Sequence, residues 1–399
     1  MKRPNPKKTA LFVITYAIFI DTLIYSLIVP LLPDIATKFS LSTAQVNGLY
    51  VIYAAALIIF TPIAGFLSNK LGKRPVMLAG LAGMAFSSLL FAFVEGYPEL
   101  MLARALQGIS ATVSWTAGLA LISDYFPSEE RGRATGIVYS GMSAGMLAGP
   151  PLAGFVYDHF GFEAPFIIAA TLAVSDLLIR MFLLKDQKQE APQKFSYRPL
   201  FRPDILGYLA LIVVGSSMAT VIEPVLPFFM RAKLGYSATQ IGFAFGWLTV
   251  VTGIFYNISG RIADKRNKPR MIFGNLALTL ISFSLLASVA NTWVLLLILN
   301  AFGVFFSFFF VPILPHISSI SEKYNANPAA VYAAFNLAYS SGMLFGPLSV
   351  FPLKELSTDA TFPALAFLYS LAFLGISVFC FVIPKRKQVL ASRAEKLGK

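Results

Sequence analysis

Two carboxyl side chains stand inside long apolar stretches of this sequence. Asp21 follows the apolar triplet at 18–20, and Glu223 lies between Ile222 and Pro224. An apolar environment favours the neutral acid, whereas a nearby cation favours the ionised carboxylate. One such group can hold a proton or a cation but not easily both, which is the chemistry of exchange. We expect both residues to bind protons or substrate; the alternatives are a structural aspartate bonded to nearby hydroxyls and a rim glutamate that stabilises an outer gate.

Three further charged residues belong to apolar stretches. Arg104 is the cation buried furthest inside one, where it would form a structural ion pair with a carboxylate or cap backbone carbonyls. Asp176 and Arg180 are four residues apart, on one face of a helix, which suits an ion pair within the helix. Because Arg180 lies near the end of its stretch, we expect this pair to be structural. Pro224 removes a backbone hydrogen bond, so we expect a kink or break beside Glu223.

The composition identifies the elements that must position these residues. Apolar residues make up 57% of the 399 residues and charged residues 13%, with 37 Phe and 16 Tyr. Soluble chains are nearer 45–50% apolar and about 25% charged, so we expect an all-α integral membrane protein. One cysteine and two histidines make a disulfide framework or a metal site improbable. The sequence has no phosphate-binding loop and no nucleophile–base grouping, so we expect neither an enzyme nor a cofactor, and the proton gradient as the energy source.

Twelve apolar runs are each long enough to cross a bilayer, which takes roughly 20 residues. The runs lie near 10–33, 44–68, 75–95, 98–123, 134–157, 164–184, 205–230, 239–262, 271–290, 293–320, 329–353 and 361–384. The first run is too long for a cleavable signal peptide, and no small-residue cleavage site follows it.

The basic residues predict the orientation. With a cytoplasmic N-terminus, 27 of the 32 lysines and arginines fall in inner segments and 4 in outer ones. This bias follows the positive-inside rule and places both termini in the cytoplasm of a multi-pass protein of the cell membrane. The net charge of +13 therefore reflects topology, and we expect no nucleic-acid partner.

Two halves of the chain resemble one another at a spacing near 195 residues. Pro30-Leu31-Leu32-Pro33 matches 224–227, and Gly149-Pro150 matches 346–347. Repeats of this kind build many transporters. We therefore predict two pseudo-symmetric six-helix bundles, 1–184 and 204–384, a cytoplasmic linker at 185–203 and a basic cytoplasmic tail at 385–399.

Several motifs make the resemblance specific. The loop at 65–77, GFLSNKLGKRPVM, and its repeat at 260–272, GRIADKRNKPRMI, resemble the signature loop of the major facilitator superfamily. The segment 102–108, LARALQG, resembles the fourth-span motif around a buried arginine, and 141–154 resembles the fifth-span motif of proton-coupled antiporters. The resemblance covers the whole chain. It implies a twelve-span transporter that works mostly as a monomer, and for Arg104 a role in proton relay or conformational coupling.

Within the superfamily the chain is similar to vesicular amine transporters, of the drug:proton antiporter branch. The similarity is carried by IDTLIYSLIVPLLP in the first span and VIEPVLP in the seventh, together with the fourth and fifth spans. Differences favour a bacterial relative: the loop after the first span is short, Tyr53 stands where those proteins have lysine, and Ser307 and Asn336 stand where they have aspartates.

Other residues are expected to couple or to line the site. Glycines at 141, 145 and 149 give one flat helix face, which permits close packing that reorients during transport, next to a bend at Pro150. Lys73 and Arg74, with Asp264 in the other half, suit a charge latch between cytoplasmic loops. The further candidates for the substrate site are Tyr25, Trp115, Asn336 and Tyr339.

The leading hypothesis is proton-coupled export of small cationic or lipophilic amines or drugs, including multidrug efflux, by alternating access. An alternative is a proton-coupled or facilitative transporter of a neutral or anionic solute, with Arg104 as the ligand. A third is a receptor or lipid scramblase on the same fold. The expected partners are a small molecule, protons and the lipid bilayer.

Overall fold

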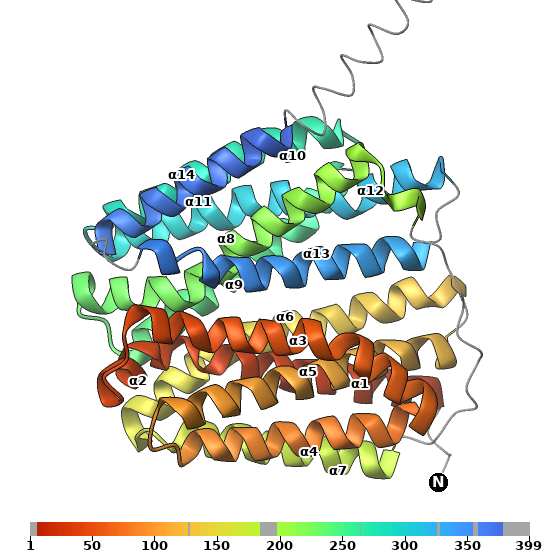
Figure 1. The fold of residues 1–399 in the computed structure, drawn as a ribbon, viewed down its shortest axis with the longest axis horizontal. Coiled ribbons are helices and arrows are strands. Elements are labelled where there is room, and N and C mark those ends of the chain that lie inside the picture. Colours follow the sequence, from red (N-terminus) through yellow and green to blue (C-terminus); the bar gives the residue numbers. More distant parts are fainter. Residues whose placement is uncertain are drawn as a thin grey trace, which may run out of the picture. The chain divides into compact units, whose positions relative to one another are not determined.

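The computed structural model describes residues 6–126, 128–183, 198–263, 265–324, 328–353 and 358–377, and within them the chain is helical without strands (Figure 1). The α-helices are α1 (Pro6–Leu27), α2 (Leu32–Lys38), α3 (Thr43–Leu71), α4 (Lys73–Ala92), α5 (Tyr97–Tyr125), α6 (Ser128–Phe160), α7 (Ala164–Leu183), α8 (Pro203–Leu234), α9 (Ala238–Ala263), α10 (Lys268–Leu285), α11 (Thr292–Phe310), α12 (Ile313–Glu322), α13 (Pro328–Leu348) and α14 (Thr358–Ser377). The short 3-10 helices are η1 (Val29–Leu31), η2 (Arg198–Leu200), η3 (Leu286–Ser288) and η4 (Phe351–Leu353).

These helices follow the twelve predicted spans in order, so the all-α, twelve-span fold is confirmed. Nine of the helices or helix pairs in the described residues are long and apolar enough to cross a membrane. Among the other spans, α5 and α6 carry more polar and small residues, including Arg104 and the glycine stripe. The protein is a multi-pass membrane protein.

Two of the described spans are broken, and a proline stands at each break. The first span is divided into α1, η1 and α2, with Pro30 and Pro33 at the starts of the two later pieces. The tenth span is divided at Pro312, between α11 and α12. Proline lacks the N–H that an α-helix needs and its ring clashes with the preceding turn.

Helix α8 continues through Pro224 and Pro227 as one helix, so it is not broken beside Glu223, and a kink there stays a prediction. A proline is tolerated inside a membrane helix where its neighbours hold the flanking turns. Glu223 itself supplies such a contact, since its carboxylate is bonded to a side chain of α1.

The chain forms two compact units. The first unit comprises Met1–Pro192 and Ile222–Val250, and the second comprises Gln193–Val221 and Val251–Lys399. The C-terminal part of α8 and the first half of α9 therefore belong to the first unit, and Glu223 lies within it.

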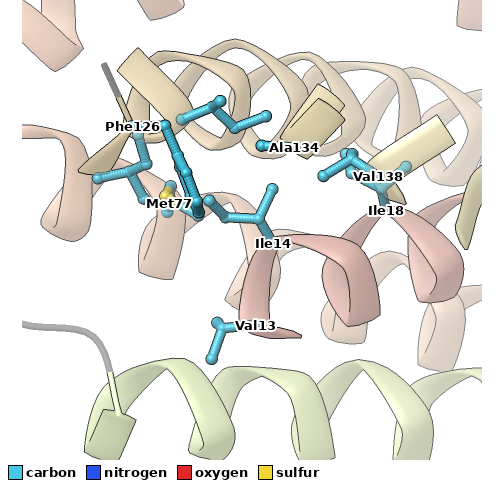
Figure 2. Close-up of a cluster of buried hydrophobic side chains, with 9 residues drawn as sticks. Val13, Ile14, Ile18, Met77, Phe126, Ala134 and Val138 are labelled. Carbon is cyan, nitrogen blue, oxygen red and sulfur yellow. The ribbon is translucent and has the colours of Figure 1, made fainter. Parts of the chain in front are cut away.

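In the first unit, α1 is the central helix. It packs against α5, α6 and α7, while α4 contacts α5 and α7 and α3 lies along α5 (Figure 1). A buried apolar cluster joins these helices. It includes Val13, Ile14 and Ile18 of α1, with Met77, Phe126, Ala134 and Val138 from neighbouring elements (Figure 2).

In the second unit, α10 packs against α11 and α14, and α12 contacts both α10 and α13 (Figure 1). Phe283 of α10 anchors this packing, with ring contacts to Phe302 of α11 and to Phe362 and Tyr369 of α14.

Candidate functional site

Asp21 is a buried carboxyl on the central helix of the first unit. It is 2% exposed, and neither of its oxygens has a hydrogen-bond partner among the described residues. The Ser114 hydroxyl of α5 lies nearby without the geometry of a hydrogen bond. A buried carboxyl with unfilled acceptors is costly to keep charged, and so it favours binding a proton or a cation.

Asp176 and Arg180 of α7 form an ion pair within one helix. The Arg180 Nε–Asp176 Oδ1 distance is 3.2 Å and the Nη2–Oδ2 distance is 2.8 Å. Both side chains have no exposed surface. The two charges also act electrostatically on Asp21 of the neighbouring helix α1, and we refer to these three residues as the charged cluster.

Glu223 of α8 is bonded to the first helix. The Tyr25 hydroxyl donates a hydrogen bond of 2.8 Å to Glu223 Oε2. Tyr25 lies four residues after Asp21, about one helical turn further along α1. Asp21 thus lies on α1 itself, and Glu223 contacts α1 about one turn later.

Arg104 of α5 is enclosed by aromatic rings. Its guanidinium carbon lies 5.2 Å from the ring centroid of Tyr50, 5.6 Å from that of Tyr53 and 6.0 Å from that of Tyr25. Phe91 of α4 closes a further side at 5.8 Å. Within helix α5, its Nη1 donates to Gln107 at 3.1 Å. Cation–π contacts of this kind stabilise a guanidinium out of water.

The tyrosines around Arg104 also contact one another. The ring centroids of Tyr25 and Tyr53 are 5.0 Å apart, and those of Tyr25 and Tyr50 are 6.5 Å apart. Tyr50 was not singled out from the sequence, although its spacing of three residues from Tyr53 places the two on one side of α3. The result is an aromatic wall, formed by Tyr25, Tyr50 and Tyr53, beside the Glu223 carboxylate.

The glycine stripe of α6 lies flush against α1. A β-carbon at Gly141 would come within 2.7 Å of the Thr15 carbonyl oxygen, and one at Gly145 would stand 3.0 Å from the Leu23 backbone nitrogen. At Gly149 it would meet the Ser26 hydroxyl. Such contacts leave no room for a side chain, so the helices touch through backbone.

Polar contacts at the far end of α1 were missed by the sequence analysis. Arg231 Nη2 of α8 lies 2.5 Å from Asp34 Oδ2 of α2, and both side chains are partly exposed. Asp158 of α6 accepts a 2.9 Å hydrogen bond from the backbone N–H of Thr239, in the first turn of α9. The repeat could have suggested the first pair, since Asp34 and Arg231 each follow a matched proline motif.

The remaining candidates lie elsewhere. Trp115 is partly buried against the apolar cluster, with its ring centroid 6.3 Å from that of Tyr139. Asn336 is exposed and Tyr339 half-buried on α13 of the second unit, where Tyr339 packs on Phe310. Their predicted part in the site stays a prediction.

The predicted charge latch is described in part. Arg74 donates from Nη2 to the Met181 carbonyl oxygen at 2.7 Å, at the end of α7. The side chain of Lys73 and all of Asp264 lie outside the described residues. The latch therefore stays a prediction.

Comparison with known proteins gives a consistent picture. Residues 14–347 match the family model of the Major Facilitator Superfamily. The synaptic vesicular amine transporter of Rattus norvegicus is 28% identical over 360 residues, covering 87% of this chain and 68% of that protein. The human chromaffin granule amine transporter is 30% identical over 313 residues, covering 76% of this chain and 59% of that protein. The chain thus spans about two thirds or less of the length of these relatives.

Solved structures share the fold. A bacterial homolog to the human lysosomal transporter Spinster, in an inward-facing and unoccupied conformation, has a TM-score of 0.74 at 15% identity and 98% coverage of both chains. The same protein in its occupied conformation has a TM-score of 0.75 at 14% identity, again with 98% coverage of each chain.

Proposed function

The chain belongs to the Major Facilitator Superfamily, and we propose that this transporter exchanges protons for small cationic or lipophilic amines or drugs, which it exports across the cell membrane. In this proposal both termini are cytoplasmic. The observation that carries it is Asp21, a buried carboxyl on the central helix whose oxygens have no hydrogen-bond partner among the described residues. A transporter, rather than an enzyme, is what the family establishes.

The exchange follows from the cost of a bare buried charge. Asp21 is neutral when it carries a proton, and it is compensated when an ammonium group sits against it. The state in which Asp21 is ionised and no cation is bound has the highest free energy of the three. Proton and substrate therefore compete for one site, and each displaces the other.

Glu223 supplies a second carboxyl within reach of the same helix. The hydrogen bond from Tyr25 favours its charged form, and Arg104 acts on it electrostatically in the same sense. Burial acts in the opposite sense. We propose that Glu223 shares the binding of protons or substrate with Asp21, one turn further along α1.

The aromatic wall supports a lipophilic cation as substrate. Tyrosine rings attract cations through their faces, and they bind apolar groups as well. The relatives to which the chain is similar are named as amine transporters. A cationic amine with an apolar body would satisfy both the carboxyl groups and the rings.

A neutral or anionic solute with Arg104 as its ligand is the second candidate. It is favoured by the two guanidinium nitrogens, Nε and Nη2, that have no hydrogen-bond partner among the described residues. Against it stands the enclosure of Arg104, which is 1% exposed and covered by four rings. We therefore propose that Arg104 acts electrostatically on the Glu223 carboxylate and keeps the surrounding tyrosine rings in place.

For alternating access we propose that the bundles 1–184 and 204–384 rock, with 185–203 as the link. The seam of Gly141, Gly145 and Gly149 would let α6 slide on α1, and Pro150 would set its bend. The cytoplasmic latch of Lys73, Arg74 and Asp264 would open and close in the same cycle.

The test is a binding panel across pH with purified protein. Amines, quaternary ammonium compounds and neutral drugs of matched size are titrated against wild type and Asp21→Asn, with Glu130→Gln as a control for the loss of one exposed carboxylate. We expect cations to bind more tightly as pH rises and Asp21→Asn to lose that dependence. Binding of neutral compounds alone, or an unchanged pH dependence in Asp21→Asn, contradicts the proposal.

A further inference from the structure

The Asp176–Arg180 pair of α7 belongs to the same buried cluster as Asp21, and this gives the pair a role that an isolated ion pair would not have. Helices α1 and α7 are in contact, and the Tyr16 hydroxyl lies 3.1 Å from the Ser175 hydroxyl. Ile179 packs on the apolar cluster of Val13, Ile14 and Ile18. The side of α7 that carries Ser175 and Ile179 therefore lies against α1.

The register of α1 places Asp21 beside this contact. Ile14, Ile18 and Asp21 are spaced by four and three residues, so they share one side of the helix. Asp176 and Ile179 are three residues apart on α7, and Arg180 is four residues from Asp176, so all three share one side as well. All three charged groups are buried, with exposures of 2%, 0% and 0% for Asp21, Asp176 and Arg180.

The hydrogen bonds between Arg180 and Asp176 leave one guanidinium nitrogen of Arg180 unused. Arg180 uses Nε and Nη2 for Asp176, while its Nη1 is buried without a partner among the described residues. Both acceptors of Asp21, on the neighbouring helix α1, also have no hydrogen-bond partner among the described residues. A planar guanidinium can serve two carboxylates at once, because its five N–H donors form a fork.

We propose that Arg180 is shared between Asp176 and Asp21 and thereby sets the proton affinity of the exchange site. With a proton on Asp21 the cluster is neutral, and Arg180 pairs with Asp176. When that proton leaves to the water on the open side, the cluster carries one net negative charge, which Arg180 compensates until a cationic substrate arrives. The cluster is neutral again when the cation is bound. This inference rests on the proposed function, with Arg180 and Asp176 as positioning residues.

Few polar or charged groups act on Asp21, which makes the proposal testable. Among the described residues, α5 contributes Ser114 and α7 contributes Asp176 and Arg180. In the part of the chain that the structure describes, helix α6 meets α1 near Asp21 through Gly145, and its ion pair with α1, Glu130 to Lys7, lies near the starts of both helices. In this cluster the guanidinium favours ionised Asp21, and the Asp176 carboxylate opposes it.

The experiment is a pH titration of the full-length protein by infrared spectroscopy, which detects the carbonyl stretch of a protonated carboxyl. The band that is lost in Asp21→Asn reports Asp21 without any transport. It is then followed in Asp176→Asn, in Arg180→Gln and in the double variant, with Glu130→Gln as control. Glu130 forms an exposed ion pair with Lys7 in the same unit.

We expect opposite shifts from the two single variants. In Asp176→Asn the guanidinium is left to Asp21 alone, so its titration midpoint falls by about one pH unit or more. In Arg180→Gln two carboxyls face each other without a cation, so the midpoint rises by a similar amount. The double variant falls between the two, and Glu130→Gln leaves the midpoint unchanged. If one single variant does not fold, the other and the double variant decide the question.

The outcomes separate this inference from the proposed function. Midpoints that stay within about 0.3 unit of wild type in every folded variant, or that move in one direction in both single variants, overturn the shared guanidinium and leave the exchange at Asp21 intact. A spectrum from which Asp21→Asn removes no titrating band overturns the exchange itself. Proton release on addition of tetraphenylphosphonium is measured on the same samples. The pH range in which protons are released must differ among the variants in the same order as the infrared midpoints.

Discussion

The Tyr25 hydroxyl is bonded to the Glu223 carboxylate at 2.8 Å, across 198 residues of sequence. This contact ties the central helix of the first unit to α8, one turn beyond Asp21. It also joins the aromatic wall to a carboxylate, so under the proposed function one hydrogen bond would affect both proton binding and the shape of the site.

Replacement of Tyr25 by phenylalanine should shift the pH dependence of transport. A hydrogen bond to a charged group is worth about 1.5–3 kcal/mol, and its loss makes the ionised Glu223 less favourable. We expect the pH profile of transport to move upward by about one unit, with the aromatic packing kept. The measurement is the initial rate of uptake into proteoliposomes across pH.

Tyr16→Phe is the matched control for that variant. It removes a phenolic hydroxyl from the same helix, whose contact is the neutral hydroxyl of Ser175 at 3.1 Å. Its pH profile should coincide with that of wild type. Equal shifts in both variants would show that the effect of Tyr25 is not electrostatic.

A methyl group at Gly145 should disrupt the seam between α6 and α1. A β-carbon there would press on the Phe19 carbonyl and stand 3.1 Å from the Thr22 β-carbon, whereas at Gly136 of the same helix it would meet nothing within 4 Å. We expect Gly145→Ala to lower the melting temperature and to abolish transport. Gly136→Ala should be neutral or stabilising by about 0.5–1 kcal/mol, because alanine favours the helix. Equal melting temperatures for the two variants would refute the close seam.

Arg104→Lys should fail although it keeps the charge. The planar guanidinium lies among four rings, and an ammonium group can neither stack in this way nor make the same contacts. We expect at least a tenfold loss of transport, about 1.4 kcal/mol, and a lower melting temperature. Arg133→Lys, at an exposed position of α6, is the control and should match wild type. Normal transport by Arg104→Lys would show that only the positive charge at this position is needed.

Exchanging the charges of Asp34 and Arg231 tests the contact between α2 and the C-terminal end of α8. Each single change, Asp34→Arg or Arg231→Asp, places like charges together and should destabilise the protein by about 1 kcal/mol, a modest value because the pair is partly exposed. The double exchange should recover most of this loss. The readout is the melting temperature in detergent, and a double variant no more stable than the single ones would argue against the pair.

The sequence was sufficient to predict the twelve spans, because an apolar run of about 20 residues is typical of a membrane-spanning helix. The break of the first span follows from Pro30 and Pro33 on the same local grounds. The uninterrupted course of α8 through Pro224 does not follow, since it depends on contacts with distant helices.

The members of the site were easier to name than their partners. Asp21, Arg104 and Glu223 stand out because charge is rare in apolar runs, and the spacing of Asp176 and Arg180 suggested their pairing. The bond between Tyr25 and Glu223 and the approach of α7 to Asp21 depend on how helices pack. Neither local spacing nor composition encodes such packing, and one sequence alone cannot supply it.

The most direct test of the account is proton-driven transport by Asp21→Asn. Purified protein is reconstituted into liposomes, a pH gradient is imposed, and the uptake of a radiolabelled lipophilic cation is followed with Glu130→Gln as the matched control. The account predicts that Asp21→Asn falls to the level of protein-free liposomes while Glu130→Gln transports at the wild-type rate. Full gradient-driven uptake by Asp21→Asn would contradict it.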